Sequence, residues 1–329
     1  MSRPTIAGVA RAAGVSVASV SRVLNGLPAT EEMVERVQRA VQDLGYVPDA
    51  RARSLKVGRT FQLTLAVADV GNPVYVTMMR AVEEVVSAAG YRLVVTTTGR
   101  DVVDEVALVR GMARGYADGL VISPLRVDED LIKSIRECEV PVVVAGNVPA
   151  KAGVDTVRAN SPKGMLLAVE HLTARGRDRI AFVNGPADTV PGTARAKGFA
   201  DAMKEFGLES AGEVEAADFT FAAGREAGKE LFENKRPTAV ICANDLLAVG
   251  VMHELAARGL AVPDDVAVVG MDDSELAEQS FPPLTSVNLG SAERGRRAAE
   301  LLLARIEDND RTPRRIVVQP SLSIRRSTP

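Results

Sequence analysis

The side chains best suited to bind a small molecule are polar residues that follow short apolar runs in the long C-terminal part of the sequence, with one arginine that opens a helical segment. Carboxylate, amide and guanidinium groups that converge would bind hydroxyl groups or an oxyanion, because Asp and Asn hydrogen-bond to hydroxyls and Arg holds oxyanions. The sequence therefore predicts a site for a hydroxyl-rich or anionic small molecule. Its candidate residues are Asp69, Tyr75, Asn147, Arg158, Arg195, Asn244 and Asp272.

Structural roles are the alternative for polar residues in such positions. A polar residue after a strand often caps the next helix, and we favour that explanation over ligand contact for Asp245. Asn72 and Pro73 are compatible with a simple turn, and Asp273 with a cap. The binding interpretation depends on whether the candidates converge in the fold.

A second kind of chemistry, the reading of DNA bases, is available near the N-terminus. The segment from Val17 to Asn25 is predicted to be the second helix of a helix-turn-helix, and such a helix lies in the major groove. Arg22 can make a bidentate contact to guanine, while Val17 and Ala18 can contact a thymine methyl. The alternative is a three-helix protein-interaction module, which the basic flanks disfavour. The outward positions are Val17, Ala18, Ser19, Ser21, Arg22 and Asn25.

Three short helices must position these base readers. Thr5 suits the N-cap of a helix from Ile6 that Gly14 breaks, and Ser16 can cap the next helix. Neither helix is long enough to be stable alone, so both need a third, which the segment from Thr30 to Leu44 provides. Its expected apolar face consists of Val34, Val37, Val41 and Leu44.

A short basic segment follows Pro48 and contains Arg53, Leu55 and Lys56. A helix this short is marginal in water, so binding to DNA could order it, with Leu55 as a wedge in a minor-groove base step. An ordinary linker whose leucine packs against a neighbour is the alternative, and composition alone favours it.

Parallel βα units are predicted for residues 61–329, where short apolar runs alternate with helical patterns such as Val74–Ala89. The expected fold is an all-α helix-turn-helix head followed by an α/β body of two doubly wound parallel-sheet lobes. Open parallel sheets bind ligands at the carboxyl ends of their strands, which is where most of the polar candidates lie. The predicted strands are Leu63–Val67, Leu93–Thr97, Leu120–Ser123, Val140–Ala145 and Asp155–Val157 in one set, and Ile180–Asn184, Ala239–Ala243 and Val266–Gly270 in the other.

Composition and charge agree with a folded protein of more than one domain. The 329 residues are 46% hydrophobic and 25% charged. Residues 1–60 hold nine Lys and Arg against five Asp and Glu, so that a net charge of +4 precedes −7 on the remainder. A basic head can pair with phosphates, while an acidic body limits unspecific binding to DNA.

Other classes of protein find little support in the sequence. Cys138 and Cys242 suggest neither a disulfide nor a thiolate metal site, and no apolar stretch resembles a signal peptide or a membrane span, so we expect a cytoplasmic location and no membrane partner. No phosphate-binding loop of an NTPase or dinucleotide type occurs, and His171 and His253 lack metal-ligand spacing. We therefore expect no enzymatic activity and no cofactor.

The head resembles the LacI/GalR family of bacterial repressors. The resemblance lies in the runs 5–10, 13–16 and 20–25, followed by 46–48 and 52–56. It implies that the basic segment is a hinge helix that pairs across a dimer and inserts Leu55 at the operator centre. Gly8 departs from the acidic residue often found at that position. The DNA contacts thus expected are Thr5, Ser16, Val17, Ala18, Ser19, Ser21, Arg22, Asn25, Arg53, Leu55 and Lys56.

The body resembles the sensor part of the same family in the runs 195–199, 243–245, 268–273 and 283–287. The resemblance implies effector contacts by Arg195, Asn244 and Asp272, with Tyr75 and Phe219 as ring-stacking walls. Relatives commonly have Asp where Ala159 stands, and Asn147 replaces a charged residue. The lost anion beside Arg158 indicates either an acidic or phosphorylated effector or a salt bridge within the protein.

We conclude from the sequence that this is a transcription regulator, a repressor, that binds near-palindromic operator DNA as a homodimer. A small polar effector bound between the two lobes, a sugar, a sugar derivative or a nucleoside-like metabolite, is expected to control its affinity for the operator. The predicted domains are a head at 1–48, a hinge at 49–60 and an effector-binding body at 61–329. One lobe of the body comprises about 61–158 and 289–318, and the other about 159–288 and 319–329. A free-standing small-molecule binding protein and a metabolic α/β enzyme are the alternatives.

Overall fold

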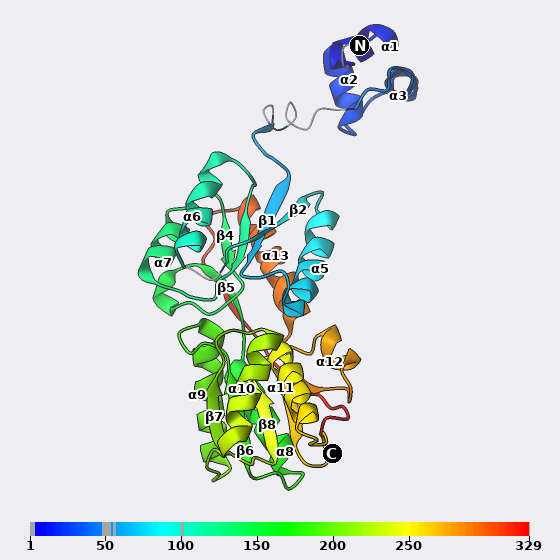
Figure 1. Cartoon of the computed structure of the whole chain (residues 1–329). Coiled ribbons are helices and arrows are strands. Elements are labelled where there is room, and N and C mark those ends of the chain that lie inside the picture. Colours follow the sequence, from blue (N-terminus) through cyan, green and yellow to red (C-terminus); the bar gives the residue numbers. More distant parts are fainter. Residues whose placement is uncertain (1–3, 48–53, 55–56, 100–101, 329) are drawn as a thin grey trace. The chain divides into compact units, whose positions relative to one another are not determined.

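A computed structural model describes residues 4–47, 54, 57–99 and 102–328 of the chain (Figure 1). The chain forms two compact units, Met1–Thr60 and Phe61–Pro329.

The first unit contains three short helices whose ends follow the predicted caps. The Thr5 side chain accepts a hydrogen bond from the Gly8 N–H in α1, and Ser16 does the same for Ser19 in α2. Arg36 of α3 donates to the carbonyl oxygens of Ala13 and Gly14 (2.6–3.0 Å), and so satisfies the C-terminal end of α1. The three helices are α1 (Ile6–Ala13), α2 (Val17–Leu24) and α3 (Glu31–Leu44).

The helices of the first unit share a small core of Val9, Ala10, Ala13, Val20, Val37 and Ala40. Leu44, which we expected on the buried face of the third helix, is 39% exposed. Leu44 is the last residue of α3, so only the preceding turn of the helix lies beside it.

The second unit contains two six-stranded sheets. The first has the order β11-β5-β4-β3-β1-β2, and every strand pair in it is parallel. Its strands are β1 (Gln62–Val67), β2 (Arg92–Thr97), β3 (Leu120–Ser123), β4 (Val142–Val144), β5 (Asp155–Ala159) and β11 (Arg315–Val318).

The second sheet has the order β12-β10-β9-β8-β6-β7 and is parallel except for the antiparallel pair of β10 with β12. Its strands are β6 (Ile180–Asn184), β7 (Gly212–Glu215), β8 (Ala239–Cys242), β9 (Ala267–Met271), β10 (Thr285–Asn288) and β12 (Ser321–Ser323). The central strands of both sheets are buried on both faces, as the continuous apolar runs in the sequence require.

Helices cover both faces of each sheet (Figure 1). Helices α5 and α13 pack together on one face of the first sheet, and α6 and α7 pair on the other. In the second sheet α8 pairs with α9, and α10 with α11. The bounds are α5 (Pro73–Ala88), α6 (Val102–Gly111), α7 (Glu129–Arg136), α8 (Ser161–Thr173), α9 (Val190–Glu205), α10 (Phe221–Asn234), α11 (Asp245–Ala257), α12 (Glu275–Gln279) and α13 (Ser291–Glu307).

The chain passes between the two sheets at three points: from β5 into α8, from β10 into α13, and from β11 into β12. Each sheet with its helices forms one lobe, so both lobes are built from separate stretches of sequence. The predicted fold class, a helical head followed by two doubly wound lobes, is confirmed. Within the described residues, no single helix has the length and apolar character of a membrane span, although α1 and α2 pass that test as a pair bent by 102°.

Candidate functional site

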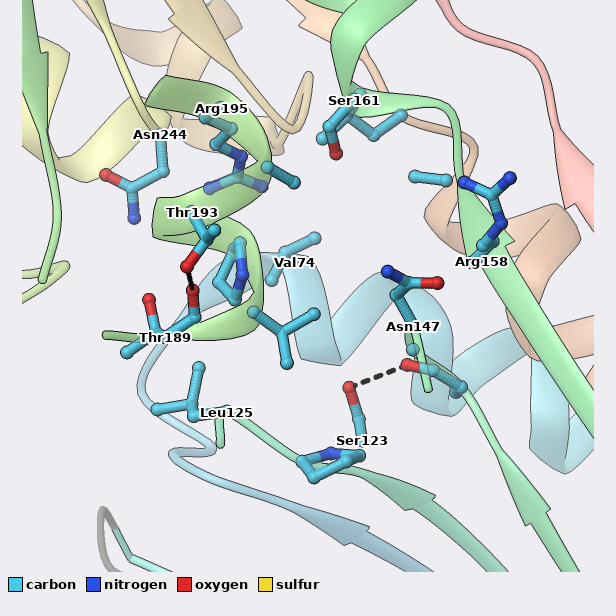
Figure 2. A pocket seen from close by; sticks show the side chains of 18 of the residues that line it. Val74, Ser123, Leu125, Asn147, Arg158, Ser161, Thr189, Thr193, Arg195 and Asn244 are labelled. Carbon is cyan, nitrogen blue, oxygen red and sulfur yellow. Dashed lines mark hydrogen bonds between the residues drawn. The ribbon is translucent and has the colours of Figure 1, made fainter. Parts of the chain in front are cut away.

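A cavity of about 570 Å³ lies where the two lobes meet, and its volume is within the usual range for a small-molecule site. The lining residues come from the carboxyl ends of strands and from the first turns of helices in both lobes. Figure 2 shows Ser123, Asn147 and Arg158 of the first lobe on one side, with Thr189, Thr193, Arg195 and Asn244 of the second lobe opposite. Seven of the eight predicted effector residues line it: Tyr75, Asn147, Arg158, Arg195, Phe219, Asn244 and Asp272.

Asp69 is the eighth predicted effector residue, and the structure places it outside the cavity lining. Its side chain is exposed, and its carboxylate accepts a hydrogen bond of 2.8 Å from the N–H of Gly71. The chain turns immediately after β1, so the polar residue that follows this strand serves the turn. Asn72 instead lines the cavity, although its side chain also caps α5 by accepting from Val74.

Arg195 lies on α9 and is 8% exposed. Its Nη2 lies 3.4 Å from Oδ1 of Asp272, and its guanidinium carbon lies 5.9 Å from the centre of the Phe219 ring. The helix begins at the N-cap Thr189, whose hydroxyl accepts from the Gly192 N–H (3.1 Å). The cap sets where the helix starts and so which of its side chains face the cavity (Figure 2).

Asp272 follows β9 in an unusual backbone conformation, with φ of 105°. Its N–H donates to the carbonyl oxygen of Val287 (2.9 Å), which ties this conformation to β10. Left-handed values cost a non-glycine residue of the order of 1–3 kcal/mol and cluster at binding sites. The Asp272 side chain is 8% exposed, and burial raises its pKa while the positive charges of Arg195 and Arg294 oppose the rise.

Asn244 caps α11, because its Oδ1 accepts from the Leu247 N–H (2.8 Å). Its Nδ2 also donates to the carbonyl oxygen of Phe219 (3.0 Å), which leaves one N–H of the amide for a ligand. Asp245, which we expected to be the cap, instead accepts from the Ser274 N–H and hydroxyl (2.8 Å each) and from the Ser286 hydroxyl (2.5 Å). The capping prediction for Asp245 was therefore wrong by one residue.

Asp245 is buried near the cavity-lining residue Asp272. Burial and the nearby charge of Asp272 raise the pKa of Asp245 to about 7, against the effect of its three hydrogen bonds. Asp273, the other predicted cap, forms an ion pair with Arg325 (2.7 Å) and accepts from Ser323 (2.7 Å). These contacts hold Asp273 against β12 and the residues after it, and Asp273 does not cap α12.

Phe219 is a wall of the cavity and is 8% exposed. Gly185 lies directly behind it, since a Cβ at this position would be 2.2 Å from Cε1 of the ring. Tyr75, at the start of α5, lines the same cavity, and its hydroxyl is hydrogen-bonded to the Ser123 side chain. Burial raises the pKa of Tyr75, so its hydroxyl is a neutral donor and acceptor.

Several lining residues were not predicted, and Arg294 is the most important of them. It lies in the first turn of α13, a helix that the chain enters from β10 of the other lobe. The rule that selects polar residues directly after apolar runs does not reach Arg294, because Arg294 lies six residues beyond the end of β10. The other unpredicted polar lining residues are Ser123, Ser161, Asp188, Thr189, Thr193 and Lys197.

The predicted base readers lie on or beside α2 of the first unit. Val17, Ala18, Arg22 and Asn25 are exposed, and Ser19 and Ser21 are partly so. Thr5 and Ser16 are exposed as well, but their side chains already serve as N-caps. The Asn25 amide donates to the Ser21 carbonyl oxygen (2.6 Å). The predicted hinge contacts Arg53, Leu55 and Lys56 lie outside the described residues.

Comparison with known proteins agrees with this two-part organisation. Residues 5–49 match the family "Bacterial regulatory proteins, lacI family", and residues 169–328 match the family "Periplasmic binding protein-like domain". Over its length, the chain is 33% identical to the HTH-type transcriptional repressor PurR of Photobacterium profundum, with 98% of each chain covered. The chain belongs to the lacI family. It is a DNA-binding transcriptional regulator, as the sequence of the helical head predicted.

Other relatives in this family are similar along nearly the whole chain. The HTH-type transcriptional regulator CelR of Thermobifida fusca is 36% identical, with 99% of this chain and 98% of CelR covered. A structure of the Lac repressor dimer bound to operator and the anti-inducer ONPF matches with a TM-score of 0.90 and 26% identity, and 99% of each chain is covered. A structure of the CelR–cellobiose complex matches with a TM-score of 0.75 and 34% identity, over 99% of this chain and 100% of that one.

Proposed function

We propose that this lacI-family regulator is a repressor that binds a near-palindromic operator as a homodimer, and that a small polar effector in the cavity between the lobes controls its affinity for DNA. One observation carries the proposal. The chain matches, from end to end, a repressor dimer captured with both operator and a small ligand, and its own cavity is lined by polar side chains from both lobes.

The DNA contacts in this proposal come from the exposed side of α2. Arg22 is an exposed cation in the last turn of that helix, and Val17 and Ala18 present small apolar groups in its first turn. A bidentate guanine contact and contacts to thymine methyls would make these three residues the base readers. Ser19, Ser21 and Asn25, with Thr5 and Ser16 at the helix ends, would contact the backbone or neighbouring bases. Arg53, Leu55 and Lys56 are proposed as the hinge contacts.

The effector contacts in the proposal are the seven predicted residues that line the cavity, joined by Arg294. Phe219 supplies a flat apolar wall, and Asn244 retains one amide N–H for the ligand. Cavities that combine an aromatic wall with several convergent polar groups are typical of small-molecule sites. The Lac repressor and CelR structures, which hold ONPF and cellobiose, support a small-molecule ligand of this kind.

The division of the chain follows from the same proposal. Residues 1–48 form the DNA-binding domain, 49–60 the hinge, and 61–329 the effector-binding and dimerisation domain with the lobe boundaries given above. We infer a cytoplasmic location from the action on DNA. We also infer that the protein lacks enzymatic activity, because the cavity holds side chains for binding but no paired nucleophile and base in the described residues.

Gel-shift titration tests the proposal. Across a set of genomic fragments, the full-length protein should bind at least one about a hundredfold or more tighter than a scrambled fragment, since specific sites exceed unspecific DNA by about three or more orders of magnitude. A free-standing binding protein would bind no fragment with preference, and that result would overturn the proposal. Retained ligand binding with no operator preference would favour that alternative.

A further inference from the structure

The charges that line the cavity do not balance. Two guanidinium groups, Arg195 and Arg294, face the single buried carboxylate of Asp272. Burial lowers the pKa of Arg294, with Asp272 and Tyr75 opposing this effect and Arg195 adding to it, so all four groups are close enough to influence each other. These three lining groups carry an excess of one positive charge with Asp272 ionised and a larger one with Asp272 protonated, while Asp245, buried near Asp272 but outside the lining, has a pKa raised to about 7.

Both guanidinium groups also keep unused hydrogen-bond donors. The Nε of Arg195 and the Nε of Arg294 are buried, and neither has a hydrogen-bond partner. Arg294 donates from Nη2 to the Ser291 hydroxyl (3.1 Å), while the contact of Arg195 with Asp272 is long at 3.4 Å. Buried donors of this kind are costly when unsatisfied, and the cost is greater for charged groups.

The other charged residues of the lining do not offset this excess. Asp188 is engaged by Arg126 through two hydrogen bonds (2.7 and 2.9 Å), and Lys197 is paired with Asp201 (2.5 Å). Arg158 is half-buried and forms no ion pair with any of the residues that the structure describes. Of the cations that line the cavity, Arg158 and Arg294 thus have no carboxylate partner among the described residues, and Arg195 has only its long contact with Asp272.

We propose that the effector is a small molecule with an oxyanion group, a phosphate or a carboxylate, which lies between Arg195 and Arg294. The inference rests on the proposed function and names the chemical class of its effector. A planar guanidinium with free N–H groups binds phosphate or carboxylate through two parallel hydrogen bonds. Arg158, on the other side of the cavity, would bind a second polar or anionic group of the same molecule (Figure 2).

The two arginines come from different lobes. Arg195 belongs to α9 on the second sheet, and Arg294 to α13, which packs on the first sheet. Two cations that face each other across a cleft repel, and an anion between them converts this repulsion into attraction for both. The effector would therefore bind the closed arrangement of the lobes more tightly than the open one, and so would favour closure.

Thermal unfolding of the full-length protein with simple oxyanions tests the inference. Inorganic phosphate and malonate are the probes, and sodium chloride at equal ionic strength is the reference. At least one probe should raise the melting temperature above the chloride value, because a ligand that binds only the folded state stabilises it. Phosphate alone, malonate alone or both would identify the anionic group that the site accepts.

Substitutions in α13 test whether the shift in melting temperature arises at Arg294. Arg294→Met should weaken the binding of the effective probe by at least about tenfold, since a charge-assisted bidentate contact is lost. Arg297→Met is the matched control, because it removes the same charge from the same helix but from an exposed residue that is paired with Glu293 and Glu300 outside the cavity lining. Arg294→Lys, which keeps the charge in the fold, should retain part of the binding.

The outcomes separate this inference from the proposed function. No melting shift with either probe, or an equal shift in Arg294→Met and wild type, overturns the oxyanion site. If Arg294→Met does not fold, an undiminished shift in Arg294→Gln relative to wild type overturns it as well, because the positive charge is then unnecessary. Operator preference in the gel shift, measured both with and without the effective probe, tests the proposed function independently of the melting shift.

Discussion

Removal of the His171 imidazole should make the second lobe less sensitive to mild acid. His171 is 6% exposed within α8, and its Nε2 lies 2.8 Å from the hydroxyl of Thr328 near the C-terminus. Burial, helped by the charge of Arg175, lowers the pKa of His171 from 6.5 to about 4. The folded protein therefore keeps this imidazole neutral at a pH at which the unfolded chain protonates it.

The sign and size of the effect follow from proton linkage. A histidine whose pKa is lower in the folded state contributes its full stability above the unfolded pKa, and the contribution is lost as the pH falls toward the folded value. With pKa values of 6.5 and about 4, the free energy of unfolding should decrease by about 2 kcal/mol between about pH 7.5 and about pH 5 through this one group.

Urea unfolding of wild type and His171→Gln at these two pH values measures the contribution. Glutamine does not titrate in this range and still offers a polar partner to Thr328, so the variant should be the less stable protein near neutral pH. The gap between the two proteins should then narrow by about 2 kcal/mol at about pH 5. His253→Gln, at an exposed position, is the matched control for the loss of an imidazole. A gap for His171→Gln that is equal at both pH values refutes the reasoning.

Three further predictions concern the first lobe, the head and the cavity wall. Burial raises the pKa of Glu105 to about 7, so its stabilisation is present below about pH 4.5 and lost as the pH rises through 7. Glu105→Gln should therefore cost about 2 kcal/mol more at about pH 5 than at about pH 7.5 in urea unfolding, a trend opposite to that of His171→Gln. Arg22→Ala should weaken operator binding by about 1–3 kcal/mol and relax the preference at one base pair, as measured by gel shift with mutated sites. Gly185→Ala should displace the Phe219 ring and weaken effector binding at least about tenfold in calorimetry, with operator binding in the absence of effector unchanged.

Local elements were predictable from the sequence because their signals are local. The caps Thr5 and Ser16 and the breaker Gly14 act within one turn of the residues they organise, and the head has the helices they predict. The central strands were visible as continuous apolar runs, since both faces are buried. The strands β7, β10, β11 and β12 were not predicted. They are short, and β7, β11 and β12 lie at sheet edges, where exposed and buried residues alternate.

Part of the candidate site was predictable from one positional rule. The carboxyl ends of parallel strands meet at one edge of a sheet, so Asn147, Asn244 and Asp272 were found from position alone. Arg294 obeys no such rule, because it reaches the cavity only when the chain returns from the second lobe to the first through α13. The excess of positive charge depends on that return of the chain. Residue order alone therefore does not predict the excess.

The contacts that join the two lobes suggest what decides their arrangement. Arg80 of α5 is paired with Glu275 of α12 (2.7 Å), and Arg126 with Asp188 at the rim of the cavity. These ion pairs are largely exposed, and exposed pairs contribute little because water and salt screen them. Arg195, which is buried, and Arg294, which is half-buried, are screened less, and without an anion they oppose closure. A ligand can shift a conformational equilibrium only by its difference in affinity between the two states. In this chain that difference is concentrated at Arg195 and Arg294, so the occupant of the cavity, and not the rim, should set the relation between the lobes.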